Sequence, residues 1–372
     1  MKISSLFSSN SERARNDGPH HQIVVSSRVR LARNLSGHPF PGWAKKNDRL
    51  QILELIKPPV ESLPEMEGAF SSYLQELSAL EKQVLVERHL ISREHAAKSA
   101  GSAVVVNKEQ TLSIMINEED HLRMQVLQPG LQLRNAFQAL DKVDSALETK
   151  LDYAFHPQLG YLTACPTNVG TGMRASAMVH LPGLVLSEQI NQVIQAINKI
   201  GLAVRGLYGE GTEAMGNLFQ ISNQITLGEP EEEIIAQLNK VIERIIENEE
   251  NARQILVQKR PGTLLDNIGR GFGILSHAYA MSSKEALNLL SFLKLGVDLG
   301  FFPPEKQNDI DDLITVTQPA HLQSNASQQK LTPEERDTLR AQIIREKLKA
   351  FPIPNTSKVV IPRPPTEETH HE

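Results

Sequence analysis

The sequence predicts an α+β protein, with a largely antiparallel sheet flanked by helices and followed by a small all-helical part. Strand-like runs in the first two-thirds are separated by hairpin-length connections, as between 103–106 and 112–116. Strand patterns cease after about Gln258, and residues 262–317 have the pattern of several short helices. Because the two ends are polar or proline-rich, we expect disorder there. The expected division is 1–20 disordered, 21–258 sheet domain, 259–351 helical domain and 352–372 disordered tail.

The first predicted strand, 23–31, carries two arginines. Side chains alternate across a strand, so Ser26, Arg28 and Arg30 share one face. Val25, Ser27, Val29 and Leu31 are expected on the other face. Two arginines on an apolar strand need an anionic partner, unless the strand is an edge strand with a solvated face, and this segment leaves both readings open. Further strands are predicted at 103–106, 112–116, 161–165, 173–181, 202–205 and 218–221.

Helix boundaries follow from capping residues, prolines and apolar spacing. Leu50–Lys57 is expected to stop at Pro58-Pro59, because the residue before a proline disfavours the helical conformation. The other predicted helices are Phe70 to about Ala79, a helix from Ser92 through Lys98, one after Pro129-Gly130 with Leu133 to Leu147 on its buried face, one from Ser187 through Lys199 ended by Gly201, one from Pro230, and one from Thr332 ending before Pro352.

The composition excludes several classes of protein. A net charge of −5 and a pI near 6.2 argue against a general nucleic-acid binder. No run of about eighteen apolar residues predicts a membrane span, and the first eighteen residues lack the apolar segment of a secretory signal. A single cysteine, Cys165, fits a reducing cytoplasm. Neither a phosphate-binding glycine loop nor Cys/His spacing for a metal is present, so no protein-bound metal is expected.

Charged side chains nevertheless gather near predicted strand ends. The run Asn117–Arg123 holds three acids, a histidine and an arginine, and a second acidic loop spans 209–213. Acidic runs are usually solvated, and a lone arginine usually forms a surface salt bridge. Five arginines at or near predicted strands are harder to dismiss, because guanidinium groups bind phosphate oxygens bidentately and keep their charge. The five arginines are Arg28, Arg30, Arg123, Arg174 and Arg205. Together with the two acidic segments, they suggest a site that holds a cation beside a polyphosphate.

Five motifs together resemble those of the guanidino (phosphagen) kinases, in the same order over residues 23 to about 228. They are Ser26–Arg30, Asn117–Arg123, Cys165–Asn168 with Gly170–Gly172, Arg174–Ser176, and Arg205-Gly206 followed by Gly209-Glu210. The resemblance implies a phosphagen-kinase-like catalytic domain at 21–258. Animal members carry a helical domain before the Ser-Ser-Arg motif, whereas this chain has a short segment there and a helical extension at the other end. In both features the chain is similar to the bacterial protein-arginine kinases (McsB type).

The resemblance also implies roles for individual residues. Glu119 and Glu210 would hold the substrate guanidinium, with Cys165 beside the reacting nitrogen. Residue chemistry alone leaves Glu118, Glu119 and Asp120 open as the base, and the motif favours Glu119. Cys165 alone would most often be an inert thiol, but nearby cations would favour its thiolate. ATP, with Mg²⁺ on its phosphates, would be bound by Ser27, Arg28, Arg30, His89, Arg123, Arg174, Ser176, His180 and Arg205.

A sixth motif lies in the last predicted helix, where Arg336 and Arg340 share one face. A solvated face is the ordinary interpretation of such a pair. The run Arg336–Ala341 is similar to the Arg-Asp-x-x-Arg-Ala motif of the protein-arginine kinases, which implies regulatory phosphoarginine binding by Arg336, Asp337 and Arg340.

Taken together, the resemblance implies a cytoplasmic kinase that phosphorylates arginine side chains of proteins and marks them for a Clp-type protease. It also implies an activator subunit, a stress-response repressor as a partner, and a homodimer. Two alternatives stay open: a kinase of free arginine or another small guanidino compound, and a non-catalytic adaptor that binds phosphoarginine proteins. Transfer of phosphate from ATP to protein, to free arginine or to neither separates the three.

Overall fold

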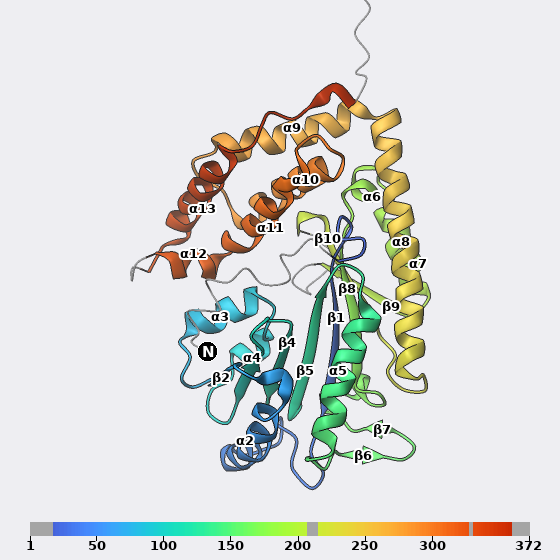
Figure 1. Cartoon of the computed structure of the whole chain (residues 1–372), viewed down its shortest axis with the longest axis vertical. Helices are drawn as coiled ribbons and strands as arrows, with labels where there is room; N and C mark the ends of the chain where they lie inside the picture. Colours follow the sequence, from blue (N-terminus) through green and yellow to red (C-terminus); the bar gives the residue numbers. More distant parts are fainter. Residues whose placement is uncertain (1–17, 207–214, 327–329, 359–372) are drawn as a thin grey trace, which may run out of the picture.

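A computed structural model describes residues 18–206, 215–326 and 330–358 of the chain. Within these ranges an eight-stranded sheet has the order β2-β3-β4-β5-β1-β8-β10-β9, and each neighbouring pair is antiparallel (Figure 1). The predicted α+β class with an antiparallel sheet is therefore confirmed. The strands are β1 Val24–Arg33, β2 Phe70–Tyr73, β3 Ala103–Val106, β4 Leu112–Ile116, β5 Leu122–Pro129, β8 Met173–His180, β9 Leu202–Gly206 and β10 Leu218–Asn223, with a separate hairpin of β6 Phe155–His156 and β7 Gly160–Tyr161.

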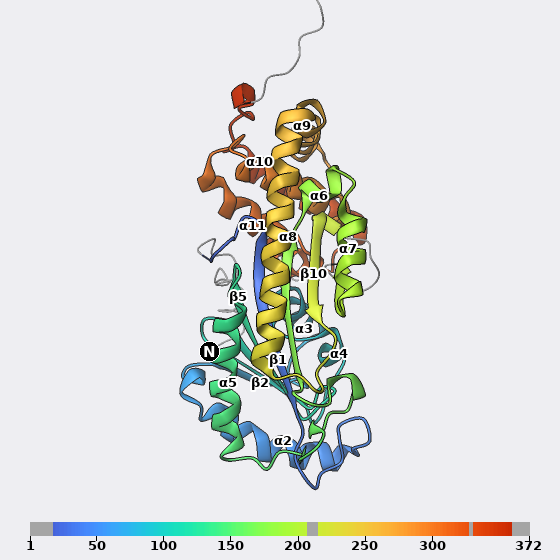
Figure 2. The same cartoon turned by 90° about the vertical axis from the view of Figure 1, so that its right-hand side faces the viewer.

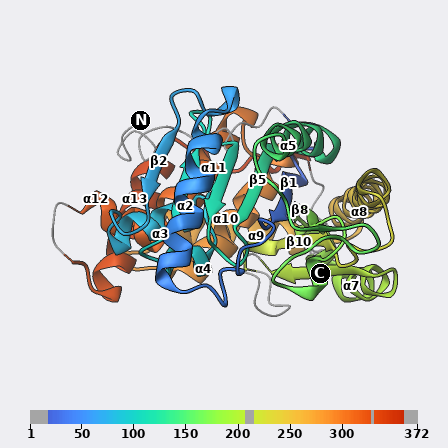
Figure 3. The same cartoon turned by 90° about the horizontal axis from the view of Figure 1, so that it is seen from below.

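Helices flank this sheet and continue beyond it. Figures 2 and 3 show the long helix α8 beside the sheet, and Figure 3 shows α2 crossing near its other end. No helix in the described ranges is long and apolar enough to cross a membrane. The helices are α2 Lys46–Glu61, α3 Ala79–Glu87, α4 Arg93–Ala96, α5 Leu133–Glu148, α6 Pro182–Leu186, α7 Ile190–Lys199, α8 Glu231–Lys259, α9 Pro261–His277, α10 Ser283–Asp298, α11 Gln307–Val316, α12 Pro319–Asn325 and α13 Pro333–Leu348.

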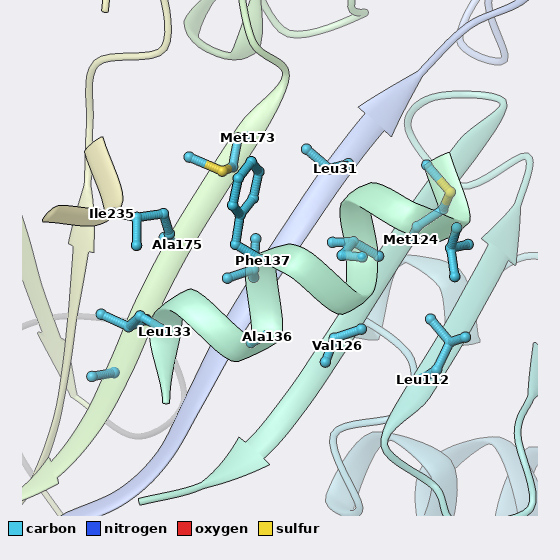
Figure 4. Packing of buried hydrophobic residues seen from close by; sticks show 14 of the residues in the cluster. Leu31, Leu112, Met124, Val126, Leu133, Ala136, Phe137, Met173, Ala175 and Ile235 are labelled. Atoms are coloured by element: carbon cyan, nitrogen blue, oxygen red, sulfur yellow. The ribbon is translucent and has the colours of Figure 1, made fainter. Parts of the chain in front are cut away.

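One face of the sheet is apolar and carries the main core. Leu31 of β1 lies opposite Met124 of β5, and Val29 lies opposite Val126, so their side chains share a face. Residues of α5 pack onto this face, as Figure 4 shows for Phe137 and its neighbours. The same cluster includes buried residues of α2 and α8. Burial of this continuous apolar surface stabilises the sheet.

The opposite face is divided into an apolar part and a charged part. Over β2, β3 and β4 it is covered by a smaller cluster that includes Val104, Met115 and Leu85 of α3. Met115 lies opposite Arg123 in the neighbouring strand. From β5 onward the same face carries arginines, because Arg30 pairs with Gln125 on one side and with Arg174 on the other. The register therefore gathers charges from three central strands on one face.

The C-terminal helices have a core of their own. It contains buried residues of α9, α10, α11 and α13, among them Leu264, Leu290 and Ile344. Helix α8 serves both cores, since Ala252 packs with the sheet cluster and Leu256 with the helical cluster. Figure 1 shows these helices at one end of the sheet. The proposed division between residues 258 and 259 thus falls at the end of a shared helix.

One predicted helix is a strand, and another ends later than predicted. The segment from Phe70 is strand β2 and then a turn, because Phe70 and Ser72 face inward in alternation and pair with β3. Helix α2 runs through Pro58 and Pro59 to Glu61. Both prolines lie near its C-terminal end, where the burial of Val60 offsets the lost backbone hydrogen bonds.

Three further predictions are corrected by local contacts. Ser187 ends α6 instead of starting a helix, and α7 begins at Ile190. A β-bulge between Val24 and Ser26 turns Val24 into the core in place of Val25. Residues 162–165 form a loop beyond β7, because the side chains of Asn34 and Asp120 bind its backbone.

Candidate functional site

Arginines of three neighbouring strands meet on the open face of the sheet. Arg30 of β1 lies opposite Arg174 of β8, and Arg123 of β5 lines the same cavity as both. Burial lowers the pKa of Arg30 well below its ordinary value, and the positive charges of Arg28, Arg123 and Arg174 lower it further. The Nε of Arg30 is buried and has no hydrogen-bond partner. An anion bound here would offset this repulsion and supply the missing acceptor.

The turn between β4 and β5 presents three consecutive acids in three different environments. Glu118 is fully buried and accepts hydrogen bonds from Ser92 and from Arg123, at 2.5 and 2.8 Å. Although burial raises the pKa of Glu118, Arg123 and Ser92 outweigh it, and the net shift is downward. Asp120 is also buried, and its Oδ1 accepts bonds from Asn34 and from the backbone of Ala164, both at 2.6 Å.

Glu119 differs from its two neighbours because its carboxylate faces the cavity. Its side chain is 45% exposed, and its closest ion-pair contact, to Arg123, is 3.9 Å. Burial, Asp120 and Glu118 raise the pKa of Glu119, against the opposing effect of Arg123. A carboxylate that is accessible, weakly paired and raised in pKa can accept a proton from a bound group. Of the three acids, Glu119 has the geometry of a base.

The cavity beside Glu119 joins the acidic turn, the arginines and the cysteine loop. It spans about 520 Å³ of empty space, part of which is open to solvent. Cys165 lies on its wall, and the Cys165 Sγ is 3.0 Å from the Thr167 Oγ1. Gly172 lies there too, at φ +64°, where an added Cβ would come within 2.6 Å of the Ala32 carbonyl oxygen. The lining residues are Arg30, Leu31, Ala32, Glu119, Asp120, Arg123, Cys165, Thr167, Asn168, Gly172 and Arg174.

A second, smaller cavity of about 260 Å³ lies further along the same face. It brings together three predicted nucleotide-binding residues, Arg28, His89 and Ser176. His89 follows α3 at φ +58°, and its carbonyl oxygen accepts a hydrogen bond from Gln125. The two cavities together place predicted phosphate-binding and guanidinium-binding residues on one surface.

Four predicted site residues lie outside both cavities or outside the described ranges. Ser27 is fully buried on the apolar face, where its hydroxyl donates to the Gly130 carbonyl and accepts from the Gln132 amide. His180 is buried against α10, with Nε2 2.7 Å from the Ser291 hydroxyl. Arg205 is exposed on β9, and Glu210 lies outside the described residues. Alternation along β1 predicts the apolar face for Ser27, with Val29 and Leu31, whereas the motif resemblance alone implies a nucleotide contact.

Two residues that position the site were missed by sequence reasoning. Asn34 donates to Asp120 and to the Leu162 carbonyl, and thereby joins the end of β1 to the acidic turn and the cysteine loop. Ser92, which was recognised only as a helix cap, also binds Glu118. Neither partner is near in sequence, so only the fold reveals these contacts.

The C-terminal motif has one buried and two accessible members. Arg340 is 2% exposed, and its guanidinium donates to the carbonyls of Thr317 and Met281 and to the Asp337 carboxylate. Arg336 is half-buried and donates to the Leu331 carbonyl. Arg340 thus fixes α13 to the preceding helices, while Arg336 and Asp337 remain accessible at its start.

Among the described residues, no three His, Cys, Asp or Glu side chains gather to form a metal site. The arginines on the sheet instead suit an anion, and Glu119 and Cys165 suit a cationic group beside it. A guanidinium held next to a polyphosphate meets both requirements.

Comparison with known proteins agrees with this geometry. Residues 51–252 match the model of the ATP:guanido phosphotransferase C-terminal catalytic domain, and residues 261–359 match that of the C-terminal domain of the protein-arginine kinase McsB. A duplicated taurocyamine kinase from Schistosoma mansoni is structurally similar, with a TM-score of 0.58, 27% identity, and coverage of 63% of this chain and 34% of that one. Lombricine kinase gives a TM-score of 0.55 at 25% identity, with coverage of 63% and 68%. The chain therefore belongs to the ATP:guanido phosphotransferase family.

Relatives that align with nearly the whole length of this chain identify its group within the family. The chain is 47% identical over 349 residues to a protein-arginine kinase of Halothermothrix orenii, which covers 94% of this chain and 99% of the relative. It is 48% identical over 335 residues to the protein-arginine kinase of Geobacillus stearothermophilus, with coverage of 90% and 92%. Within its family, the chain belongs to the protein-arginine kinases, and the resemblance found in the sequence is confirmed.

Proposed function

We propose that this chain transfers the γ-phosphate of ATP to arginine side chains of proteins. The observation that carries the proposal is the single cavity that joins Glu119 and Cys165 to Arg30, Arg123 and Arg174. Membership of the protein-arginine kinases supports the same reaction. The alternative of a non-catalytic adaptor lacks a reason for mutually repelling arginines to gather beside an accessible acid.

The chemistry needs a neutral nucleophile, because a protonated guanidinium is poorly nucleophilic. Glu119 orients the substrate guanidinium and accepts its proton as the new N–P bond forms. The P–O bond to the ADP leaving group breaks in the same step. Arg30, Arg123 and Arg174 hold the phosphates and stabilise the charge of the transferred group, and Mg²⁺ bound to the nucleotide adds to that stabilisation. Glu210 and Cys165 are proposed to hold the guanidinium from its other sides.

Several finer proposals rest on the family resemblance. They are a cytoplasmic location, an activator subunit, a Clp-type protease and a stress-response repressor as partners, a homodimer, and regulation by phosphoarginine bound at Arg336 and Asp337. Ser27, His180 and Arg205 remain predicted nucleotide-binding residues. Because Ser27 and His180 are buried, we expect them to affect nucleotide binding indirectly, Ser27 through the position of β1 and His180 through its contact with α10.

The direct test is transfer from ATP·Mg²⁺ to an arginine-rich unfolded protein and, in parallel, to free arginine. A P–N bond hydrolyses in acid, whereas phosphoserine survives, so acid lability identifies the product. We expect acid-labile label on the protein. Label on free arginine at a comparable rate would reassign the chain to kinases of small guanidino compounds, and phosphoarginine binding without turnover would favour the adaptor.

A further inference from the structure

A groove next to the cavity at Glu119 is not used by the reaction described above. It contains about 1180 Å³ of empty space, more than twice that of the cavity at about 520 Å³. Both are lined by Glu119 and Arg123, so they adjoin one another at these two side chains. The groove is lined by Phe40, Gly42, Trp43, Glu94, Lys98, Glu118, Glu119, Arg123 and Ala164.

Trp43 stands at this groove as an almost fully exposed indole. It is 90% exposed, although tryptophan is among the most costly side chains to leave in water. An exposed aromatic residue beside a functional cavity often marks a contact surface for a partner. The chain has a single tryptophan, so this exposure concerns one identifiable side chain.

The loop that carries Trp43 is anchored directly to the acidic turn. His121, two residues after Glu119, has its Nε2 3.1 Å from the Pro39 carbonyl oxygen, and its ring packs edge-on against Phe40 at 6.0 Å. The amide of Trp43 donates to the Phe40 carbonyl in a tight turn. Pro41 and Ala44 are buried on either side of Trp43. The backbone is thus fixed relative to Glu119, and the indole projects from a rigid turn.

The charges of the groove suit a cationic segment. Glu118 and Arg123 neutralise one another through a 2.8 Å ion pair. Glu119 and Glu94 remain as acids, close enough that Glu94 raises the pKa of Glu119, and Lys98 is the opposing base. If the target arginine of a polypeptide enters the cavity at Glu119, the residues on either side of that arginine would lie along the groove, which has the Trp43 indole at one edge.

We propose that Trp43 docks the polypeptide of the protein substrate, by packing against apolar side chains that flank the target arginine in an extended segment. This inference rests on the proposed protein-arginine kinase activity and adds a specificity residue to it. Unfolded segments expose apolar side chains next to arginines, whereas folded surfaces bury them. The groove therefore gives a physical basis for preferring unfolded proteins over free arginine.

The single tryptophan makes docking measurable without turnover. Ten-residue peptides with one central arginine flanked by leucine, or by glycine and serine, are titrated into the full chain without ATP while tryptophan emission is recorded. We expect the leucine-flanked peptide to quench or blue-shift the emission and the glycine-flanked peptide to do so several-fold more weakly. Peptide binding, measured by calorimetry, with unchanged emission would overturn the proposal.

Variants test the same contact during turnover. Trp43→Ala is expected to raise KM for the leucine-flanked peptide about tenfold, the loss expected of an interface hot-spot aromatic, with kcat and the KM for ATP little changed. Trp43→Phe should restore most of the affinity. Tyr279→Ala, which removes a residue 79% exposed among the C-terminal helices, is the matched control.

The outcomes separate this proposal from the function on which it rests. No transfer to protein by the unmodified chain would contradict the kinase proposal. Full transfer by the unmodified chain with an unchanged KM in Trp43→Ala would contradict only the docking role. An equal loss with both peptides would assign Trp43 to the architecture of the site and would also overturn docking.

Discussion

At the scale of single residues, three neighbouring acids acquire different properties from their surroundings. Glu118 is buried and paired with Arg123, Asp120 is buried and bonded to Asn34, and Glu119 is partly exposed in the cavity. The first two hold the turn in place, while the third is free to act on a ligand. The distinction lies in burial and hydrogen bonding, because the residue types are nearly identical.

Glu119→Gln is expected to reduce phosphate transfer at least a hundredfold, because an amide cannot accept the guanidinium proton. ATP affinity should change little, since the arginines proposed to bind the phosphates are intact. Transfer rates with acid-labile product and nucleotide titration check the two parts. Glu54→Gln, on the exposed face of α2 and away from the cavity, is the control and should retain activity. Retention of full activity in Glu119→Gln would remove Glu119 from the role of base.

The pH dependence of transfer should report the same carboxylate. Burial and the charge of Asp120 raise the pKa of Glu119 above its ordinary value of 4.5. The base acts when deprotonated, so activity is present above that pKa and is lost as pH falls through it. A profile of kcat/KM at saturating ATP should show this acid limb. Because Glu94 contributes to the upward shift, Glu94→Gln should move the limb slightly to lower pH. If the residual activity of Glu119→Gln showed the same acid limb, the assignment of that limb to Glu119 would be contradicted.

At the scale of elements, side chains from distant segments bind backbone groups and fix helices and loops in place. Asp120 holds the cysteine loop through the Ala164 amide, and Arg340 holds α13 through two carbonyls. Such contacts explain why the C-terminal motif contains residues with unequal exposure. Its buried arginine acts on helix packing, whereas its accessible residues suit a ligand.

Arg340→Ala should lower the free energy of unfolding by about 3 kcal/mol, because it leaves two buried carbonyls without donors. Arg336→Ala should change it by about 0.5 kcal/mol or less, as expected of a surface substitution. Denaturant unfolding followed by circular dichroism compares the two. If phosphoarginine binds at this motif, Arg336→Ala should weaken its binding without loss of stability. Equal stability of the two variants would contradict the structural role of Arg340.

At the scale of the whole molecule, the helical part contacts the sheet part near the proposed nucleotide-binding residues. The Glu87 carboxylate at the end of α3 accepts hydrogen bonds from the amides of Ala320 and His321 at the start of α12. His321 Nδ1 is 2.7 Å from the same carboxylate. His89 lies two residues after Glu87, so the contact joins the C-terminal helices to a wall of the smaller cavity.

Glu87→Ala should therefore loosen α12 and weaken nucleotide binding together. Loss of the carboxylate leaves the first amides of α12 without their acceptor. Hydrogen exchange measured by mass spectrometry should quicken in α12 and around His89, and the Kd for ATP should rise a few-fold. Glu54→Ala, on the exposed face of α2, should change neither. Faster exchange in α12 with an unchanged Kd would separate the contact from nucleotide binding.

Side-chain alternation and the order of motifs were enough to predict the antiparallel α+β class, the arginine-bearing strand, the acidic turn and the family, because these are local patterns. Contacts between distant segments separate Glu119 from Glu118 and Asp120, bury His180 against α10, and leave Trp43 exposed beside the site. The helix predicted from Phe70 to about Ala79 is instead strand β2 and a turn, because pairing with β3 decides its conformation. Burial, register and backbone hydrogen bonds depend on partners far along the chain, and no local pattern contains that information.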